Sequence, residues 1–177
     1  NSDLLDIRQI FNAANYNIVQ EFDISSEKFA EQFSLLYEVN SDKIESLALY
    51  GNEGRLIASE PVAVEKENID VTGQDWYKNA ESAIENVHFS VPHIQNLYED
   101  GLYRYHWVVS LSRYVDINDG EIPGSGVLLV DMKYSVIEDV LKQINDSSEG
   151  IYYYMISRDG QMIYHPRKTE MARGLFE

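Results

Sequence analysis

The chain opens with hydrophobic residues spaced three or four apart, which is the spacing of one face of an α-helix. Between residues 2 and 22 this stripe consists of Leu4, Ile7, Phe11, Ala14, Ile18 and Phe22. The polar residues 23–26 interrupt it, and a second helical stripe follows over residues 27–37. The sequence therefore predicts a long amphipathic N-terminal helix, present either as one bent helix or as two.

Alternating or continuous apolar runs follow the helical region and predict β-strands. The longest runs cover residues 103–115 and 126–133, and the polar residues 116–125 between them, with Gly120, Pro123 and Gly124, indicate a loop. Shorter segments complete the prediction: strands at 44–50, 55–58 and 87–91, helices at 74–84 and 134–144, and a second hairpin at 151–164 that resembles the one at 44–58. The fold class is α+β, with a mostly antiparallel sheet and helices against it.

The two longest strands carry the candidate chemistry. In the first, an aromatic and aliphatic face that includes Tyr105 and Trp107 alternates with a face that includes Ser110 and Ser112. The second is apolar until Asp131, and a carboxylate inside such a run is costly to bury without a partner. The pair predicts the floor of a small-molecule pocket. Asp131 would contact a ligand, cap the helix predicted from Tyr134, or pair with Arg113.

Composition removes several classes of function. The net charge of -16 over 177 residues disfavours binding to nucleic acid. The absence of cysteine excludes disulfides and thiolate zinc sites. His88, His93 and His106 lack the ligand spacing of a metal helix, and no nucleophile elbow or phosphate loop is present, so no metal, cofactor or hydrolytic activity is expected. No apolar run reaches the ~18 residues of a membrane span, and we interpret the chain as part of a longer protein.

The order of these elements resembles the double Cache sensor domain, a PAS-like module of bacterial transmembrane receptors. The resemblance covers essentially the whole chain. It is carried by QDWY at residues 74–77, GVLLVD at 126–131, and the two similar hairpins, while SLSR at 110–113 and YHPR at 164–167 look most like sensor histidine kinases. It implies a stalk helix over residues 1–40, a membrane-distal ligand-binding module over 41–146, and the start of a membrane-proximal module over 147–177.

By this resemblance, the domain lies on the extracytoplasmic face of the membrane and senses a small polar solute. The parent receptor would be membrane-anchored, homodimeric and a histidine kinase. The alternatives are a chemoreceptor, a cyclic-dinucleotide enzyme, or a ligand-free dimerisation module.

The ligand-binding residues expected from the sequence and from the resemblance are Gln74, Trp76, Tyr77, His93, Tyr105, Trp107 and Asp131. Trp76, Tyr77 and Asp131 match the pattern of amino-acid-binding relatives. Gln74 stands where those relatives have arginine, and His93 where they have tyrosine. The missing cation removes a bidentate partner for an α-carboxylate. This departure ranks a sugar, a polyol or another neutral solute above an amino acid.

Overall fold

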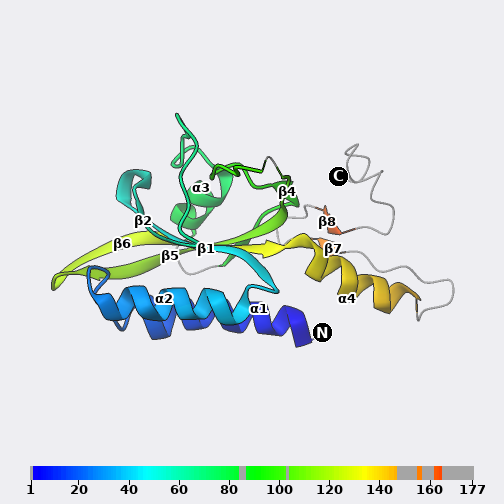
Figure 1. Cartoon of the computed structure of the whole chain (residues 1–177), viewed down its shortest axis with the longest axis horizontal. Helices are drawn as coiled ribbons and strands as arrows, with labels where there is room; N and C mark the ends of the chain where they lie inside the picture. Colours follow the sequence, from blue (N-terminus) through cyan, green and yellow to red (C-terminus); the bar gives the residue numbers. More distant parts are fainter. Residues whose placement is uncertain (1, 84–86, 103, 147–154, 157–161, 165–177) are drawn as a thin grey trace.

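A computed structural model describes residues 2–83, 87–102, 104–146, 155–156 and 162–164. Three layers are visible in Figure 1: a helix pair, an antiparallel sheet, and an upper layer of loops around one short helix. The mixed α and antiparallel β fold with an N-terminal helix confirms the predicted fold class.

The central sheet has the strand order β2-β1-β6-β5-β3, and β4 also pairs with β5. All of its pairings are antiparallel. Its strands are β1 (Ile44–Gly51), β2 (Leu56–Glu60), β3 (His88–Phe89), β4 (His93–Ile94), β5 (Trp107–Asp119) and β6 (Ile122–Lys133). The long strands β5 and β6 lie near the centre, so residues on both of their faces are covered by other layers.

The N-terminal region forms two helices. α1 (Ser2–Asn12) continues through the π-helical segment η1 (Ala13–Val19), and α2 (Glu27–Asn40) returns antiparallel to them (Figure 1). Ser26 ends the intervening turn by accepting a hydrogen bond from the Phe29 amide at 3.1 Å, as expected of an N-cap serine. The predicted break at residues 23–26 thus separates two helices.

The helix pair covers one face of the sheet. Phe11, Ile18, Phe29 and Phe33 are buried against strand residues such as Leu111. Side chains alternate between the two faces of a strand, so the residues adjacent to these core positions face the upper layer.

The β5–β6 hairpin is longer than predicted, and the loop prediction for residues 116–125 is wrong. The strands pair up to Asp119 and Ile122, and only Gly120 and Glu121 form the turn, both with positive φ. A two-residue turn with positive φ at both positions continues the twist of the strands, and glycine adopts such a φ without strain. The turn is also tied to the helix pair, because the Gly120 amide donates to Asp23 Oδ2 at 2.6 Å. Pro123 and Gly124 therefore lie within a strand.

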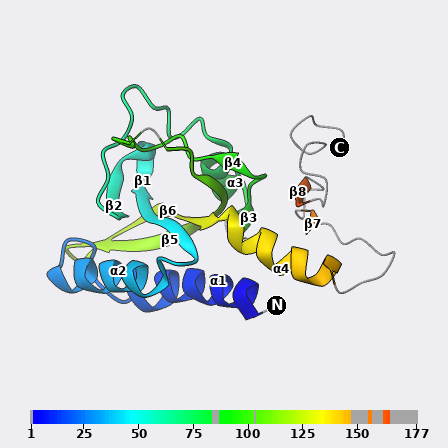
Figure 2. The same cartoon turned by 45° about the vertical axis from the view of Figure 1, so that its right-hand side comes forward.

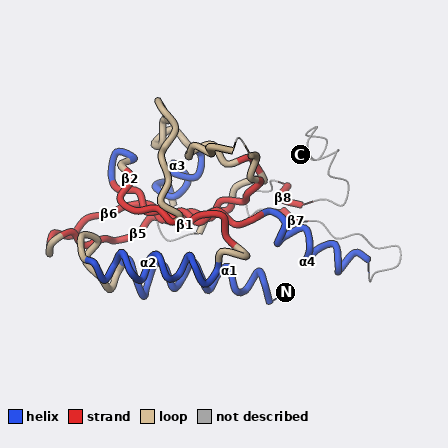
Figure 3. Tube along the Cα trace, viewed as in Figure 1, coloured by secondary structure: helices blue, strands red, loops and turns tan. Residues whose placement is uncertain are grey.

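The upper layer consists mainly of loops, as the tan trace in Figure 3 shows. It includes α3 (Asp75–Ser82), the 3-10 turn η2 (Asn52–Gly54), and the short strands β3 and β4, and it arches over the sheet in Figure 2. Two strand predictions were too long. The segment at 87–91 contributes only His88–Phe89, and β5 begins at Trp107, because these segments pair with the sheet only at those residues.

After β6, α4 (Tyr134–Asp146) extends away from the sheet (Figure 1). β7 (Met155–Ile156) and β8 (Met162–Tyr164) pair antiparallel, which confirms that residues 151–164 contain a hairpin. The turn of this hairpin and residues 165–177 lie outside the described residues. The boundary between a distal and a proximal module at residue 147 stays a prediction. Within the described part of the chain, no helix combines the length and the apolar character of a membrane span.

Candidate functional site

A buried carboxylate lies on the sheet face that the upper layer covers. Asp131 of β6 is 2% exposed and is directly paired with Ser110 on β5 and Ser46 on β1. The Ser110 hydroxyl donates to Asp131 Oδ1 at 2.6 Å, and the Ser46 hydroxyl donates to Oδ2 at 3.4 Å. Burial raises the pKa of Asp131, while Ser110, His93 and Ser46 oppose that shift. We call Ser46, Ser90, His93, Ser110 and Asp131 the polar cluster.

His93 connects the upper layer to this carboxylate. Its Nδ1 is 2.9 Å from the Val91 carbonyl oxygen, which can only accept, so Nδ1 carries a proton. Its Nε2 is 3.3 Å from Ser110 Oγ. The Ser110 hydroxyl donates to Asp131, so its oxygen links the carboxylate to the His93 ring.

Ser90 holds this part of the upper layer on β5. Its amide donates to the Ser110 carbonyl at 2.8 Å, and its hydroxyl accepts from the Ser110 amide at 2.8 Å. Its hydroxyl also lies 3.3 Å from His93 Nδ1. The position of His93 over Asp131 is thus fixed by both backbone and side-chain bonds.

Aromatic rings form a wall on the same face. The Trp76 ring lies 5.2 Å from that of Tyr50 and 5.7 Å from that of Tyr77. α3 is held against the sheet by the Ser112 hydroxyl, which donates to the Trp76 carbonyl at 2.8 Å, and by the Tyr77 hydroxyl, which donates to the Gly51 carbonyl at 3.0 Å. Trp76 and Tyr77 are 6% and 2% exposed and belong to the hydrophobic cluster of this face, so their rings form part of its core.

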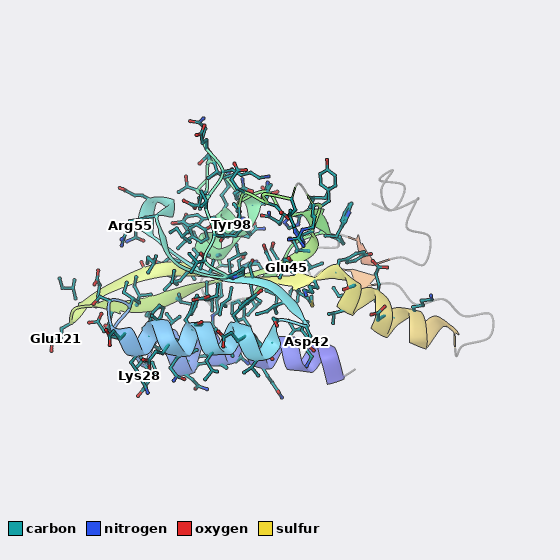
Figure 4. All side chains as sticks on the ribbon, in the orientation of Figure 1. Lys28, Asp42, Glu45, Arg55, Tyr98 and Glu121 are labelled. Atoms are coloured by element: carbon teal, nitrogen blue, oxygen red, sulfur yellow. The ribbon has the colours of Figure 1, made fainter. Side chains whose placement is uncertain are left out.

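Two buried tyrosines complete the wall. The hydroxyls of Tyr50 and Tyr98 are 2.9 Å apart, and Figure 4 places Tyr98 in the upper layer directly above the sheet. Burial raises the pKa of both hydroxyls, and the charge of Asp131 adds to the effect on each. Both tyrosines stay neutral and available as hydrogen-bonding groups.

The loop that carries Tyr98 is fastened to the sheet by His106. Its Nε2 lies 2.7 Å from Asp100 Oδ2, and its Nδ1 lies 3.0 Å from Glu45 Oε1 on β1, which Figure 4 shows at the sheet. His106 thus lies between carboxylates of the loop and of β1 and connects the two. The Leu102 amide and His106 together lower the pKa of Asp100 to about 2.

The structure brings four of the seven predicted residues to one face of the sheet, as two pairs: Trp76 and Tyr77 belong to one aromatic cluster, and His93 and Asp131 both contact Ser110. Gln74 is half-buried at the N-cap of α3, and its backbone N–H donates to the Val71 carbonyl. Tyr105 and Trp107 are placed apart from this group, with exposed fractions of 79% and 50%. The Trp107 ring faces Tyr134, at a centroid distance of 6.5 Å.

Of the three roles considered for Asp131, pairing with Arg113 is ruled out. The side chain of Arg113 lies on the opposite face of β5, toward the helix pair, where its guanidinium donates to the Tyr16 hydroxyl at 3.0 Å. The carboxylate of Asp131 is bonded instead to serines on the neighbouring strands.

Sequence reasoning did not select Ser46, Ser90, Ser110, Tyr50 or Tyr98 as site residues. Ser110 had a signal, because it lies on the polar face of the strand that neighbours Asp131. Tyr98 had none, since it reaches the site from a loop whose path depends on the whole upper layer. Among the described residues, no group of three His, Cys, Asp or Glu side chains is arranged to hold a metal ion.

Comparisons with known proteins extend these observations. A family model described as "Cache domain" matches residues 2–176. No curated protein matches the sequence.

Among solved structures, the ligand-binding domain of the Pseudomonas fluorescens chemoreceptor CtaA in complex with L-serine is 19% identical, with a TM-score of 0.63, and the match covers 96% of this chain and 67% of that chain. For the amino acid chemoreceptor PctC of Pseudomonas aeruginosa PAO1 in complex with GABA, the identity is 20%, the TM-score 0.65 and the coverage 95% and 69%. The ligand-binding domain of PctB of the same organism, in complex with L-Arg, is 20% identical with a TM-score of 0.62, and the match covers 96% of this chain and 62% of that chain. This chain thus spans about two thirds of the length of the solved domains.

The ranking of ligand classes from the sequence is wrong. Sugars and polyols were placed above amino acids, yet the similar solved domains contain L-serine, GABA and L-Arg. The missing arginine at Gln74 was given too much weight, because a carboxylate such as Asp131 can hold a ligand by its ammonium group instead.

Proposed function

This chain belongs to the Cache domain family of sensor modules, and on that premise we propose that it is the extracytoplasmic ligand-binding domain of a bacterial transmembrane receptor. Its ligand is an amino acid or a closely related amine. The ligand ammonium binds at Asp131, beside the rings of Trp76 and Tyr77. The domain contributes binding and conformational change, and the output resides elsewhere in the receptor.

The observation that carries this proposal is the buried Asp131 beneath the upper layer. The hydrogen bonds to its carboxyl in the described part of the chain come from the hydroxyls of Ser110 and Ser46, and His93 lies 3.3 Å from the Ser110 hydroxyl. A ligand ammonium can donate a charge-assisted hydrogen bond to this carboxylate. Aromatic rings nearby favour a cation over a neutral group.

Ligand binding would pull the upper layer onto the sheet. His93 and Ser90 are already bonded to β5, and α3 is bonded through Ser112, so a ligand shared by these groups and Asp131 would tighten all of them. The resulting signal is limited by the difference in ligand affinity between the two states of the receptor.

Two output modules are considered. The SLSR and YHPR motifs favour a sensor histidine kinase. A chemoreceptor is the second candidate, because the similar solved domains come from chemoreceptors. Assaying the full receptor for kinase autophosphorylation and for methylation-dependent adaptation separates the two.

Isothermal titration of the purified chain against a set of amino acids and amines tests the binding proposal. We expect at least one ligand whose binding is abolished by Asp131→Ala. Asp116→Ala is the matched control, because Asp116 is an exposed aspartate of the neighbouring strand β5. Equal binding by the two variants, or no binding across the set, would refute the proposal.

A further inference from the structure

In the segment after β2, residues 62–65, hydrophobic side chains point to solvent and an acidic side chain points inward. Val62 and Val64 are 88% and 72% exposed, whereas the intervening Ala63 packs on the aromatic cluster and Glu65 turns inward. Hydrophobic burial would favour the opposite orientation. A slip of one residue would bury Val64 and expose Glu65.

Backbone bonds fix this orientation. Glu65 is bridged to Tyr98, the Lys66 amide donates to the Leu97 carbonyl at 2.8 Å, and the Glu99 amide donates to the Val64 carbonyl at 2.9 Å. This isolated bridge between two loop segments places Glu65 directly opposite Tyr98. Backbone hydrogen bonds therefore hold Val64 outward and Glu65 inward.

The inward side chain of Glu65 lacks a partner for one of its oxygens. Oε1 is shielded from solvent and has no hydrogen-bond partner among the described residues. A shielded carboxylate oxygen without a donor is unfavourable, so it indicates a place for a donor supplied from outside the chain.

Glu65 and Asp131 approach the same pair of tyrosine hydroxyls. Glu65 lies opposite Tyr98 in the bridge, and the Tyr98 hydroxyl is 2.9 Å from that of Tyr50. Tyr50 shares one face of β1 with Ser46, whose hydroxyl donates to Asp131, so the two acids lie on the same side of the sheet with the tyrosine pair between them. The negative charges of both acids raise the pKa of both tyrosines, which agrees with this arrangement. A metal ion does not explain them, since no metal-holding group of three ligands exists among the described residues.

We propose that Glu65 is a specificity-determining residue that holds a second ammonium group, so that the ligand of this domain carries two. Asp131 binds one ammonium, and Glu65 binds the other beside the Tyr50–Tyr98 pair. This inference rests on the proposed function and adds the ligand's second charge to it. The shared chemistry occurs both in basic amino acids and in aliphatic diamines.

Isothermal titrations of the full chain with three probes of nearly equal length separate the contribution of the second ammonium group from that of the carboxylate. L-lysine has two ammonium groups and a carboxylate, cadaverine has two ammonium groups only, and L-norleucine has one ammonium group and a carboxylate. We expect lysine and cadaverine, the two probes with two ammonium groups, to bind roughly tenfold or more tightly than norleucine, as one charge-assisted hydrogen bond provides. Lysine above cadaverine identifies a basic amino acid as the ligand class, and the reverse order identifies a diamine.

The variant Glu65→Gln keeps the size of the side chain and removes its charge. We expect it to weaken lysine and cadaverine by roughly tenfold or more and to leave norleucine unchanged. Glu67→Gln, at an exposed position of the same loop, should change none of the three. An unliganded unfolding temperature equal to or above that of the wild type shows that Glu65→Gln is folded, because the substitution removes a shielded charge.

Norleucine binding as tight as lysine binding would overturn the inference, and so would an equal loss of all three probes in Glu65→Gln. Failure of all three probes to bind would also overturn it. The proposed function is decided separately, by the full ligand set and the comparison of Asp131→Ala with Asp116→Ala.

Discussion

The bond between Ser110 and Asp131 gives a direct test of the polar cluster. Ser110→Ala removes the donor that lies 2.6 Å from Asp131 Oδ1 and leaves a buried carboxylate oxygen without its main partner. It also removes the group that faces His93 Nε2 at 3.3 Å. A hydrogen bond to a charged group contributes about 1.5–3 kcal/mol. We therefore expect the free energy of unfolding to fall by about 2 kcal/mol.

Thermal unfolding followed by circular dichroism measures this loss. For a chain of this length, 1 kcal/mol corresponds to roughly 2–4 °C, so the midpoint should fall by about 4–8 °C. Ser125→Ala is the control, because Ser125 lies on the adjacent strand β6 and makes an exposed hydrogen bond, to Asn52 at 3.3 Å. Its effect should stay within about 0.5 kcal/mol.

A double-mutant cycle with Asp131→Asn then isolates the role of the charge. The amide oxygen of the substituted side chain can still accept from Ser110, and its NH2 group can donate to Ser46, so the packing is retained. With a neutral acceptor, Ser110→Ala should cost only about 1 kcal/mol, which leaves a coupling energy of about 1 kcal/mol. Equal costs of Ser110→Ala in the wild-type and Asp131→Asn backgrounds, or a cost no larger than that of Ser125→Ala, would refute the argument.

Three further predictions concern titration and packing. Because burial raises the pKa of Asp131 above its unfolded value, the stability of the unliganded protein should fall as the pH rises through the folded pKa, and pH-dependent denaturation of Asp131→Asn should lack this component. His106→Ala should move the pKa of Asp100 upward from about 2 without restoring its ordinary value, since the Leu102 amide remains, and NMR titration of the carboxyl can follow this. Gly126→Ala should destabilise the protein by roughly 1–3 kcal/mol in chemical denaturation, because a Cβ there would collide with the Tyr50 carbonyl oxygen, whereas Gly101→Ala meets no atom within 4 Å and should be nearly neutral.

The sequence predicted the parts of the fold that depend on local spacing. The helical stripe from Ile7 to Ile18 indicates the helix face that packs on the sheet, and the alternation of Val109 and Leu111 with Ser110 and Ser112 separates the face of β5 that packs on the helices from the face under the upper layer. The hairpin turn was mispredicted because Pro123 and Gly124 were weighted as breakers. Gly120 is the stronger local signal, because a two-residue turn requires positive φ and glycine adopts it without strain.

The candidate site was less accessible to sequence reasoning, because its members come together through long-range pairing. Asp131 stood out as an isolated acid in an apolar run, but its partners are set by the register of three strands. Glu65 and Tyr98 lie in loops with no periodic pattern. Their inward orientation is seen only in the structure, where Tyr98 is buried and Glu65 Oε1 is shielded from solvent. Tyr105 and Trp107 were selected as aromatic residues of a strand, yet β5 begins only at Trp107.

The same strand serves both the ligand face and the helix face, and this determines how binding can be transmitted. On β5, Ser110 and Ser112 contact the upper layer, while Arg113 donates to the Tyr16 hydroxyl of η1 and lies over its ring at 5.7 Å. A closure that draws Ser110 toward a ligand must therefore displace the backbone that positions Arg113. π-helical segments such as η1 are rare and occur frequently at functional sites. We therefore expect a change at the polar cluster to reach the helix pair through the backbone of β5, which carries both Ser110 and Arg113.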